Sequence, residues 1–246
     1  YRESEKIISA FGENLLSKIN PKTGRIHPDY MQIGADTGRF ACSNPNLQQI
    51  PTGSLFRSCF IASPGHKLVV ADYSQIELRI MAELSEDPVF LKAFKEDQDL
   101  HALTASQMFG IPLDQVTKER RFQAKSINFG LMYGRGARSL AVQLGVSEEE
   151  SKLLLDKYFR QYHRVKAWLD NVAKESVRRG YSMTMGGRKR YFEKISPADP
   201  NYDRQVSYIE RQGKNTPIQG TSADITKIAL VKLWNRIRKE RLQAVP

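Results

Sequence analysis

HKLVVADYSQIELR, residues 66–79, contains the transition on which the fold depends. Its first half, His66–Asp72, is a β-branched apolar run that ends in an acid, a pattern typical of a buried strand. From Ile76 onward helical patterns take over and continue as far as Arg179. The sequence therefore predicts a strand that leads directly into a large block of helices.

The segments before and after this stretch predict the remaining elements of the fold. Residues 1–20 predict a helix, and residues 21–63 are rich in turn-forming side chains, with short extended pieces at Tyr30–Ile33 and Phe56–Ile61. After the helical block, Tyr181–Phe192 predicts a hairpin around a Gly-Gly turn. A strand-rich region that is interrupted by a large helical insertion predicts an α+β fold.

Two helices are expected after the hairpin. One runs toward Arg211, and the last one starts after Gly220. The last helix has apolar side chains at four-residue spacing, which predicts a face that packs on a core. These side chains are Ile225, Ala229, Leu233 and Ile237.

The charge balance favours a polyanionic partner. The 246 residues include 38 Lys and Arg against 27 Asp and Glu, a formal net charge of +11. Nucleic acid is the commonest partner of such a chain, although a basic, solvated surface would give the same count. No apolar run reaches the roughly 18 residues needed to span a bilayer, so no membrane partner is expected. The first residues resemble an amphipathic helix rather than a signal peptide, so the expected location is intracellular, in the cytoplasm or, as the alternative, in an organelle.

Cysteine and histidine do not predict a zinc site. The chain has Cys42 and Cys59 without a CxxC pair, and its 4 histidines are scattered. Asp72 is the stronger metal candidate, because a carboxylate at a strand end is fixed in space and Mg²⁺ prefers carboxylates together with phosphate oxygens. The alternative is that Asp72 only caps the helix that follows it.

A second candidate site lies on one face of a predicted helix. Arg121, Lys125, Phe129 and Tyr133 recur every four residues before Gly134. Two cations followed by two aromatic rings suit a ligand with phosphates at one end and a base at the other. The alternative is an ordinary amphipathic helix with core aromatics and solvated basic residues.

Polar loops form a third candidate site. Thr37–Arg39 and Asn44–Pro51 are dense in side chains that offer both donors and acceptors, as contacts along a minor groove require. Arg211, Asn215 and Gln219 lie four apart and predict another polar face. Plain turn chemistry explains the loops equally well.

Four motifs resemble those of the family A DNA polymerases of the bacterial polymerase I type. They are TGRFACSNPNLQQIP at 37–51, DYSQIELR at 72–79, RFQAKSINFGLMYG at 121–134 and NTPIQGTSAD at 215–224. Their order and approximate spacing agree with the family over essentially the whole chain. The resemblance implies a right-hand polymerase architecture, with a partial antiparallel-sheet palm and a large helical fingers insertion.

The resemblance also implies how the chain is divided. Residues 1–85 would form a thumb-base and palm segment that carries the metal-binding aspartate. Residues 86–200 would form helical fingers, and residues 201–246 would form palm helices.

The resemblance assigns the candidate catalytic roles to Asp72, Lys125 and Glu77. Asp72 and the Tyr73 carbonyl would bind two Mg²⁺ ions, and Glu77 would exclude the ribose 2′-hydroxyl. Arg121 and Lys125 would grip the incoming triphosphate with help from Gln75 and His101. The remaining implied roles follow: Phe129 packs on the incoming nucleotide, Tyr133 stacks on the template base, and Arg39, Asn46, Arg57, Arg211, Asn215 and Gln219 contact DNA.

The implied reaction is template-directed transfer of deoxynucleotides from dNTPs to a primer 3′-hydroxyl on primer–template DNA. Two Mg²⁺ ions would stabilise the attacking and leaving oxygens, and closure of the Arg121–Tyr133 helix around a matched pair would give selectivity.

The sequence departs from the family pattern at one point. The family's further metal aspartate lies in a His-Asp-Glu hairpin, and no His-Asp-Glu occurs in these residues. We therefore expect a fragment or split half that is inactive alone, with a second polypeptide as a further candidate partner. A non-catalytic primer–template binding module and a single-subunit RNA polymerase are the two alternatives.

Overall fold

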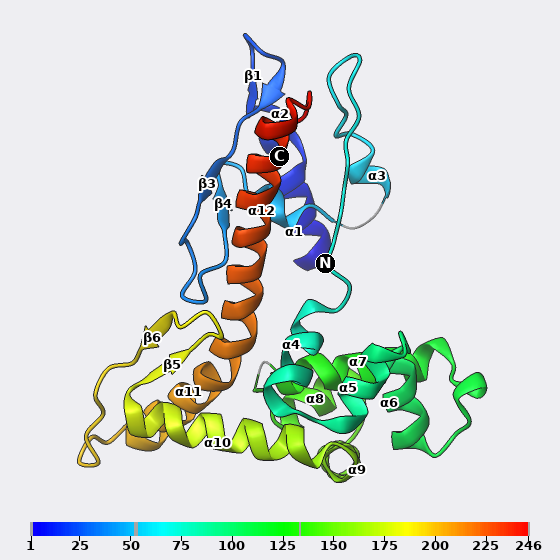
Figure 1. The fold of residues 1–246 in the computed structure, drawn as a ribbon, viewed down its shortest axis with the longest axis vertical. Helices are drawn as coiled ribbons and strands as arrows, with labels where there is room; N and C mark the ends of the chain where they lie inside the picture. Colours follow the sequence, from blue (N-terminus) through cyan, green and yellow to red (C-terminus); the bar gives the residue numbers. More distant parts are fainter. Residues whose placement is uncertain (1, 52–53, 133, 246) are drawn as a thin grey trace. The chain divides into compact units, whose positions relative to one another are not determined.

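The computed structural model describes residues 2–51, 54–132 and 134–245. The chain divides into two compact units, Tyr1–Ser74 and Gln75–Pro246. The elements of both units are labelled in Figure 1. None of the described helices is long and apolar enough to cross a membrane.

The first unit consists of short elements. Its helical segments are α1 (Arg2–Phe11), α2 (Glu13–Leu16), η1 (Leu47–Gln49) and α3 (Ser54–Arg57). Its strands form two antiparallel pairs, β1 (Ile19–Asn20) with β2 (Arg25–Ile26) and β3 (Asp29–Met31) with β4 (Ala41–Ser43).

The single helix expected over residues 1–20 is divided at Gly12. A Cβ at this position would lie 2.5 Å from the Ile8 carbonyl oxygen, so the bend there requires glycine. Ile19 and Asn20 leave the helix and pair with Ile26 and Arg25. The extended piece expected near Tyr30 is confirmed in β3, which pairs with β4.

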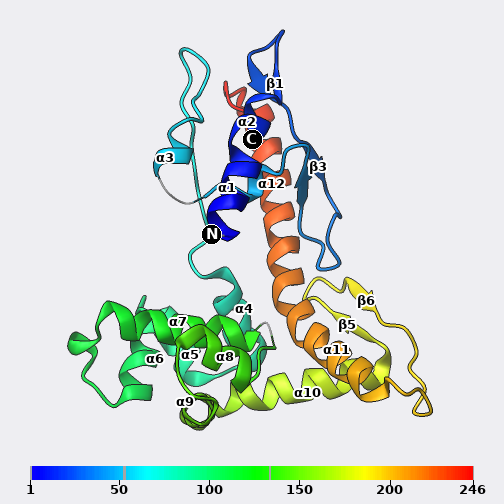
Figure 2. The same ribbon diagram turned by 180° about the vertical axis from the view of Figure 1, so that it is seen from behind.

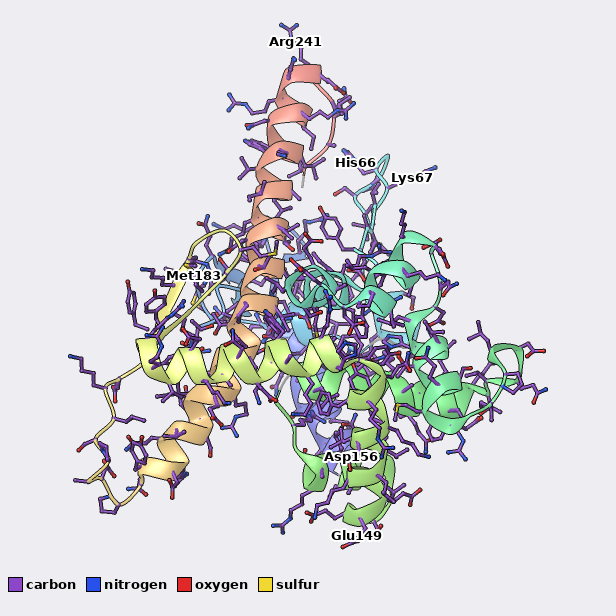
Figure 3. The ribbon with its side chains drawn as sticks, turned by 60° about the horizontal axis from the view of Figure 1, so that its bottom comes forward. His66, Lys67, Glu149, Asp156, Met183 and Arg241 are labelled. Carbon is purple, nitrogen blue, oxygen red and sulfur yellow. The ribbon has the colours of Figure 1, made fainter. Side chains whose placement is uncertain are left out.

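Two strand predictions for the first unit were wrong. Residues 56–57 belong to the helical turn α3, and residues 66–72 form no strand with any part of the chain that the structure describes. Val69 and Val70 are 92% and 88% exposed, and His66 and Lys67 lie at the tip of the loop that leads to them (Figure 3). A β-branched run favours the extended conformation, but a strand also needs a neighbour for its backbone donors and acceptors.

The second unit is mainly helical, as predicted from Ile76 to Arg179. Its helices are α4 (Ile76–Ser85), α5 (Pro88–Lys95), α6 (Leu100–Phe109), η2 (Leu113–Gln115), α7 (Lys118–Met132), α8 (Ala137–Leu144), α9 (Glu148–Gln161), α10 (His163–Arg179), α11 (Tyr202–Asn215), η3 (Thr216–Gly220) and α12 (Thr221–Glu240). The long helix α10 connects two groups of elements: α4–α9 gather at one end, and α11 with the hairpin lies at the other (Figures 1 and 2).

Short polar side chains start several of these helices. The Asp87 carboxylate accepts the backbone N–H groups of Val89 at 3.1 Å and Phe90 at 3.3 Å. Asp99 caps α6 in the same way, and Ser147 caps α9. Such caps satisfy donors that a helix leaves unpaired in its first turn.

The core of the helical group contains three packed aromatic rings. Tyr162 lies with its ring centroid 4.8 Å from that of Phe90 and 4.6 Å from that of Tyr158, both in edge-on geometry. All three side chains are fully buried, together with Leu100 and Ile127. Because this cluster takes residues from α5, α6, α7, α9 and the start of α10, it holds these helices together.

The predicted hairpin is confirmed. β5 (Tyr181–Met183) pairs with β6 (Lys189–Tyr191), with Tyr181 opposite Tyr191 and Met183 opposite Lys189. Met183 marks this hairpin in Figure 3. Gly187 has a φ of 83°, a left-handed conformation that glycine adopts without strain.

Pro217 explains how the hairpin attaches to the helices. Proline has no N–H, so the carbonyl of Gly213, four residues earlier, receives no helical hydrogen bond from it. The Ser182 hydroxyl of β5 donates to that carbonyl at 2.9 Å instead. The chain passes through a π-helical turn at η3 before α12 begins.

The apolar face expected on the last helix is only partly covered. Ile237 is buried and Ile225 is half-buried, whereas Leu233 remains 47% exposed. The first residues of α12, Thr221–Ala223, are buried where the helix leaves η3.

Candidate functional site

Helix α7 presents two chemically different faces. Ala124, Ile127 and Leu131 are buried on the side that packs on the core. Arg121 and Lys125 are exposed, and Phe129 is half-buried one turn after Lys125. The spacing of four residues therefore places two cations and a ring on one side of the helix, as expected. Tyr133, the fourth member of this face, lies outside the described residues.

Asp99 fixes the Arg121 side chain. The Nε of Arg121 donates to the Asp99 carboxylate at 2.6 Å, and that carboxylate also accepts the backbone N–H groups of His101 and Ala102. Partial burial acts to raise the pKa of Asp99, but the Arg121 guanidinium and the two helix amides outweigh it and hold the pKa below its ordinary value. Asp99 therefore stays ionised beside Arg121.

His101, in the first turn of α6, faces α7 and is neutral at physiological pH. Its side chain is 3% exposed, and its ring lies 5.7 Å from the Phe129 ring. Burial, together with the nearby Arg121 and Lys125 charges, lowers the pKa of His101 to about 4, and Asp99 opposes this only in part. The structure thus brings together four of the predicted nucleotide-binding residues: Arg121, Lys125, Phe129 and His101.

The sequence reasoning missed Asn128, which is fully buried and lies 3.0 Å from the His101 ring nitrogen Nδ1 through its Nδ2. The signal was present in the sequence. Asn128 falls one residue after Ile127 and four after Ala124, on the apolar side of α7, where a polar side chain needs a buried partner.

Gln75 and Glu77 lie at the start of α4. Gln75 adopts a left-handed conformation with a φ of 53°, and its Oε1 is buried without a hydrogen-bond partner among the described residues. Glu77 is in the first turn of α4 and is 7% exposed. Both belong to the second unit, together with α7.

Asp72 and Tyr73 are exposed and belong to the first unit. Asp72 is not the cap residue of α4, because the N-cap is Gln75, which makes no side-chain capping hydrogen bond. Within the described part of the chain, no three His, Cys, Asp or Glu side chains gather as a metal-binding group. Asp72 is thus an accessible carboxylate that belongs to no such group among the described residues.

The predicted DNA contacts are divided between the units. In the first unit, Arg39 and Arg57 are exposed, while Asn46 uses its side-chain oxygen to cap η1, accepting the Gln48 N–H at 3.0 Å. Asn46 therefore has the local turn function that was the alternative to a DNA contact for this loop. In the second unit, Arg211 is exposed, Asn215 is half-buried and Gln219 is 9% exposed.

Arg211 packs beside the end of α7. A Cβ on Gly134 would lie 2.7 Å from the Arg211 Cγ, and Gly134 has a φ of 67°. Both the close approach and the left-handed backbone require glycine at this turn. The turn after α7 is therefore packed directly against α11.

Comparisons with known proteins agree with this fold. The family model for DNA polymerase family A matches residues 1–245. The chain is 42% identical to DNA polymerase I of Caldicellulosiruptor bescii, covering 99% of this chain and 29% of that protein. It is 41% identical to the thermostable DNA polymerase I of Thermus aquaticus, covering 97% of this chain and 29% of that protein. The chain therefore spans less than a third of the length of these relatives.

A solved structure is similar over nearly the whole chain. It is the POL domain of Pol1 from M. smegmatis in complex with DNA primer-template and dNTP. The TM-score is 0.89 and the identity 35%, covering 98% of this chain and 43% of the other. The expected α+β polymerase architecture is confirmed by this similarity and by the fold described above.

The depressed pKa of His101 makes stability depend on pH. The unfolded chain takes up this proton near the ordinary pKa of 6.5 and the folded chain only near about 4. The unfolded state therefore binds more protons between these values, and the unfolding free energy falls by about 3 kcal/mol as the pH drops from 6.5 to 4. Urea unfolding at pH 7 and pH 4 measures this loss. We expect His101→Gln to remove it and His163→Gln, at an exposed position, to retain it; an equal loss in all three proteins would contradict the assignment.

Proposed function

The chain belongs to DNA polymerase family A, and on that premise we propose that it takes part in template-directed DNA synthesis, the transfer of deoxynucleotides from dNTPs to a primer 3′-hydroxyl. The observation that carries the proposal is the exposed face of α7, where Arg121 and Lys125 lie one turn apart and Phe129 follows at the next turn. A deoxynucleoside triphosphate matches this face, because it has negatively charged phosphates at one end and an aromatic base at the other.

The residues of this face divide the work of binding a nucleotide. The Arg121 guanidinium is held through its Nε by Asp99, which leaves its two terminal nitrogens to donate to phosphate oxygens. Lys125 would add a second positive charge one turn away. Phe129, supported by the His101 ring, would pack on the sugar or base. Such an arrangement fixes the triphosphate before reaction and reduces the entropy that the transition state must lose.

We assign residues 1–85 to the thumb base and palm, residues 86–200 to the fingers and residues 201–246 to palm helices. The partners would be dNTPs and primer–template DNA, the ligands with which the M. smegmatis relative was solved. Arg39, Asn46, Arg57, Arg211, Asn215 and Gln219 would contact the DNA. A match to a DNA polymerase family favours deoxynucleotides over ribonucleotides as substrates.

Metal ions would supply charge stabilisation for the phosphoryl transfer. Asp72 and the Tyr73 carbonyl are the residues proposed to bind two Mg²⁺ ions. We propose that a further carboxylate, from a His-Asp-Glu hairpin that these 246 residues do not contain, completes the metal site.

Primer extension tests the proposed function. We expect the purified 246 residues to retard a primer–template duplex but to add no nucleotide, because one aspartate cannot hold two cations against their mutual repulsion. Adding a polypeptide that carries the His-Asp-Glu hairpin should restore templated addition of dNTPs. Absence of DNA binding would refute the proposal, while extension by the 246 residues alone would refute only the need for the hairpin. Binding without extension, even in the presence of the hairpin, would instead support a non-catalytic module.

Lys125→Ala should weaken nucleotide use far more than DNA binding. The lost contact is a charge-assisted hydrogen bond, worth about 1.5–3 kcal/mol, or roughly a 10- to 150-fold rise in the dNTP concentration needed for extension in the completed enzyme. Lys152→Ala is the matched control, since Lys152 is an exposed lysine of α9. Equal losses in DNA affinity and nucleotide use would show that this face of α7 contacts DNA.

Glu77→Ala should relax sugar selectivity in the completed enzyme. We propose that Glu77, in the first turn of α4, excludes the ribose 2′-hydroxyl by a clash with its side chain. A thousandfold preference corresponds to about 4 kcal/mol, which a clash and a disrupted hydrogen bond supply together. Ribonucleotide incorporation should rise while deoxynucleotide incorporation stays level or falls. If both decrease equally, Glu77 supports the structure and the selection occurs elsewhere.

A further inference from the structure

A chain of buried polar groups runs beneath the exposed face of α7. Asn128 is fully buried, and its side-chain Nδ2 lies 3.0 Å from Nδ1 of His101 and 3.3 Å from Oγ1 of Thr104. Thr104 Oγ1 lies 3.0 Å from the Tyr162 hydroxyl, which donates to Gln107 Oε1 at 3.0 Å. The chain thus links His101, beside Arg121 and Phe129, to the aromatic core.

The donors and acceptors of this chain fix the orientation of the Asn128 amide. Thr104 has one hydroxyl proton, which it gives to the Leu100 carbonyl at 2.7 Å or to Tyr162. In both cases its oxygen has a lone pair left to accept from Asn128. Turning the amide over would put its two N–H donors where Oδ1 now lies without a hydrogen-bond partner among the described residues, so two buried donors rather than one buried acceptor would be unpaired. The amide nitrogen therefore faces both Thr104 and His101.

This orientation decides which nitrogen of His101 carries the proton. Because Asn128 Nδ2 is a donor, Nδ1 of the neutral ring must accept, and the proton then resides on Nε2. We propose that Asn128 is a positioning residue that holds His101 in the Nε2–H tautomer, so that the ring donates this hydrogen bond to an oxygen of the incoming triphosphate. The part of this proposal that concerns the nucleotide rests on the proposed function.

The charges that face His101 make the choice of tautomer matter. Asp99 lies at the start of its own helix, and Arg121 and Lys125 face it from α7. Burial and these cations lower the pKa of His101 to about 4, while burial raises the pKa of Tyr162, so both groups are neutral at pH 7. A neutral ring donates only from the nitrogen that carries its proton. With the proton on Nδ1, Nε2 would present a lone pair to the phosphate oxygens and repel them.

Nitrogen NMR on the 15N-labelled chain tests the tautomer directly. In wild type, the His101 ring should show a protonated Nε2 and a bare Nδ1 from pH 9 to pH 6, without titrating. His101→Gln assigns the signals among the 4 histidines. A protonated Nδ1 in the wild-type ring would overturn the proposal without the use of any other variant.

Asn128→Asp is the informative substitution because it keeps the shape of the side chain and replaces the donor by an anionic acceptor. The introduced carboxylate should move the neutral ring's proton to Nδ1 and raise the pKa of His101 well above about 4. Above the raised pKa, Nε2 is bare, so the affinity for dATP with Mg²⁺ should fall as the pH rises. At pH 9 we expect it to be about tenfold weaker than wild type, the equivalent of one lost hydrogen bond to a charged group.

Control measurements separate this role from a structural one. Ser126→Ala, at a buried position of α7 outside the polar chain, should leave the tautomer and the pH profile of dATP affinity unchanged. A general loss of structure in Asn128→Asp would lower dATP affinity equally at pH 7 and pH 9, which would overturn the proposal, as would an unchanged His101 tautomer. A wild-type chain that bound neither dATP nor DNA would refute the proposed function instead, while its His101 tautomer would still decide whether Asn128 orients the ring.

Discussion

The packing of α7 against the aromatic core is the interaction on which the rest of the helical unit depends. Ile127 and Leu131 project from α7 into the cluster that contains Phe90 and Tyr162. Burying such a side chain stabilises the fold by about 1.5–3 kcal/mol relative to leaving it in water. Because one side of α7 is committed to this contact, the other side, with Arg121 and Lys125, is held toward solvent in a fixed rotation.

Polar contacts around the site contribute orientation more than stability. The side chains of Arg121 and Asp99 are 44% and 41% exposed, and ion pairs in such surroundings stabilise a protein by about 0–1 kcal/mol. Asp99 nevertheless joins the start of α6 to α7, so the guanidinium has one preferred position. The buried bonds of Asn128 act similarly, since a wrong arrangement there would leave donors without acceptors in a dry environment.

The attachment of the hairpin shows how a hydrogen bond missing within one helix leads to a tertiary contact. Pro217 removes one hydrogen bond from the end of α11, and Ser182 of β5 uses the carbonyl that is left. Arg188, the residue immediately before β6, donates through Nε to Asp224 of α12 at 2.9 Å. Gly213 also lets α11 approach α10 closely, since a Cβ there would lie 2.6 Å from the Ser176 Cβ. The hairpin is thereby attached to both α11 and α12.

The sequence by itself determined the helical block, the hairpin, the cationic and aromatic face of α7 and the family resemblance, because these depend on local spacing and on motifs that can be read along the chain. It did not determine whether residues 66–72 pair as a strand, since a β-branched run does not supply a neighbouring strand. Only the tertiary structure placed Asn128 against His101 and set that ring neutral beside two cations. These features depend on which residues from different helices meet and on how much water they exclude. The spacing of residues along one helix determines neither the contacts nor the burial.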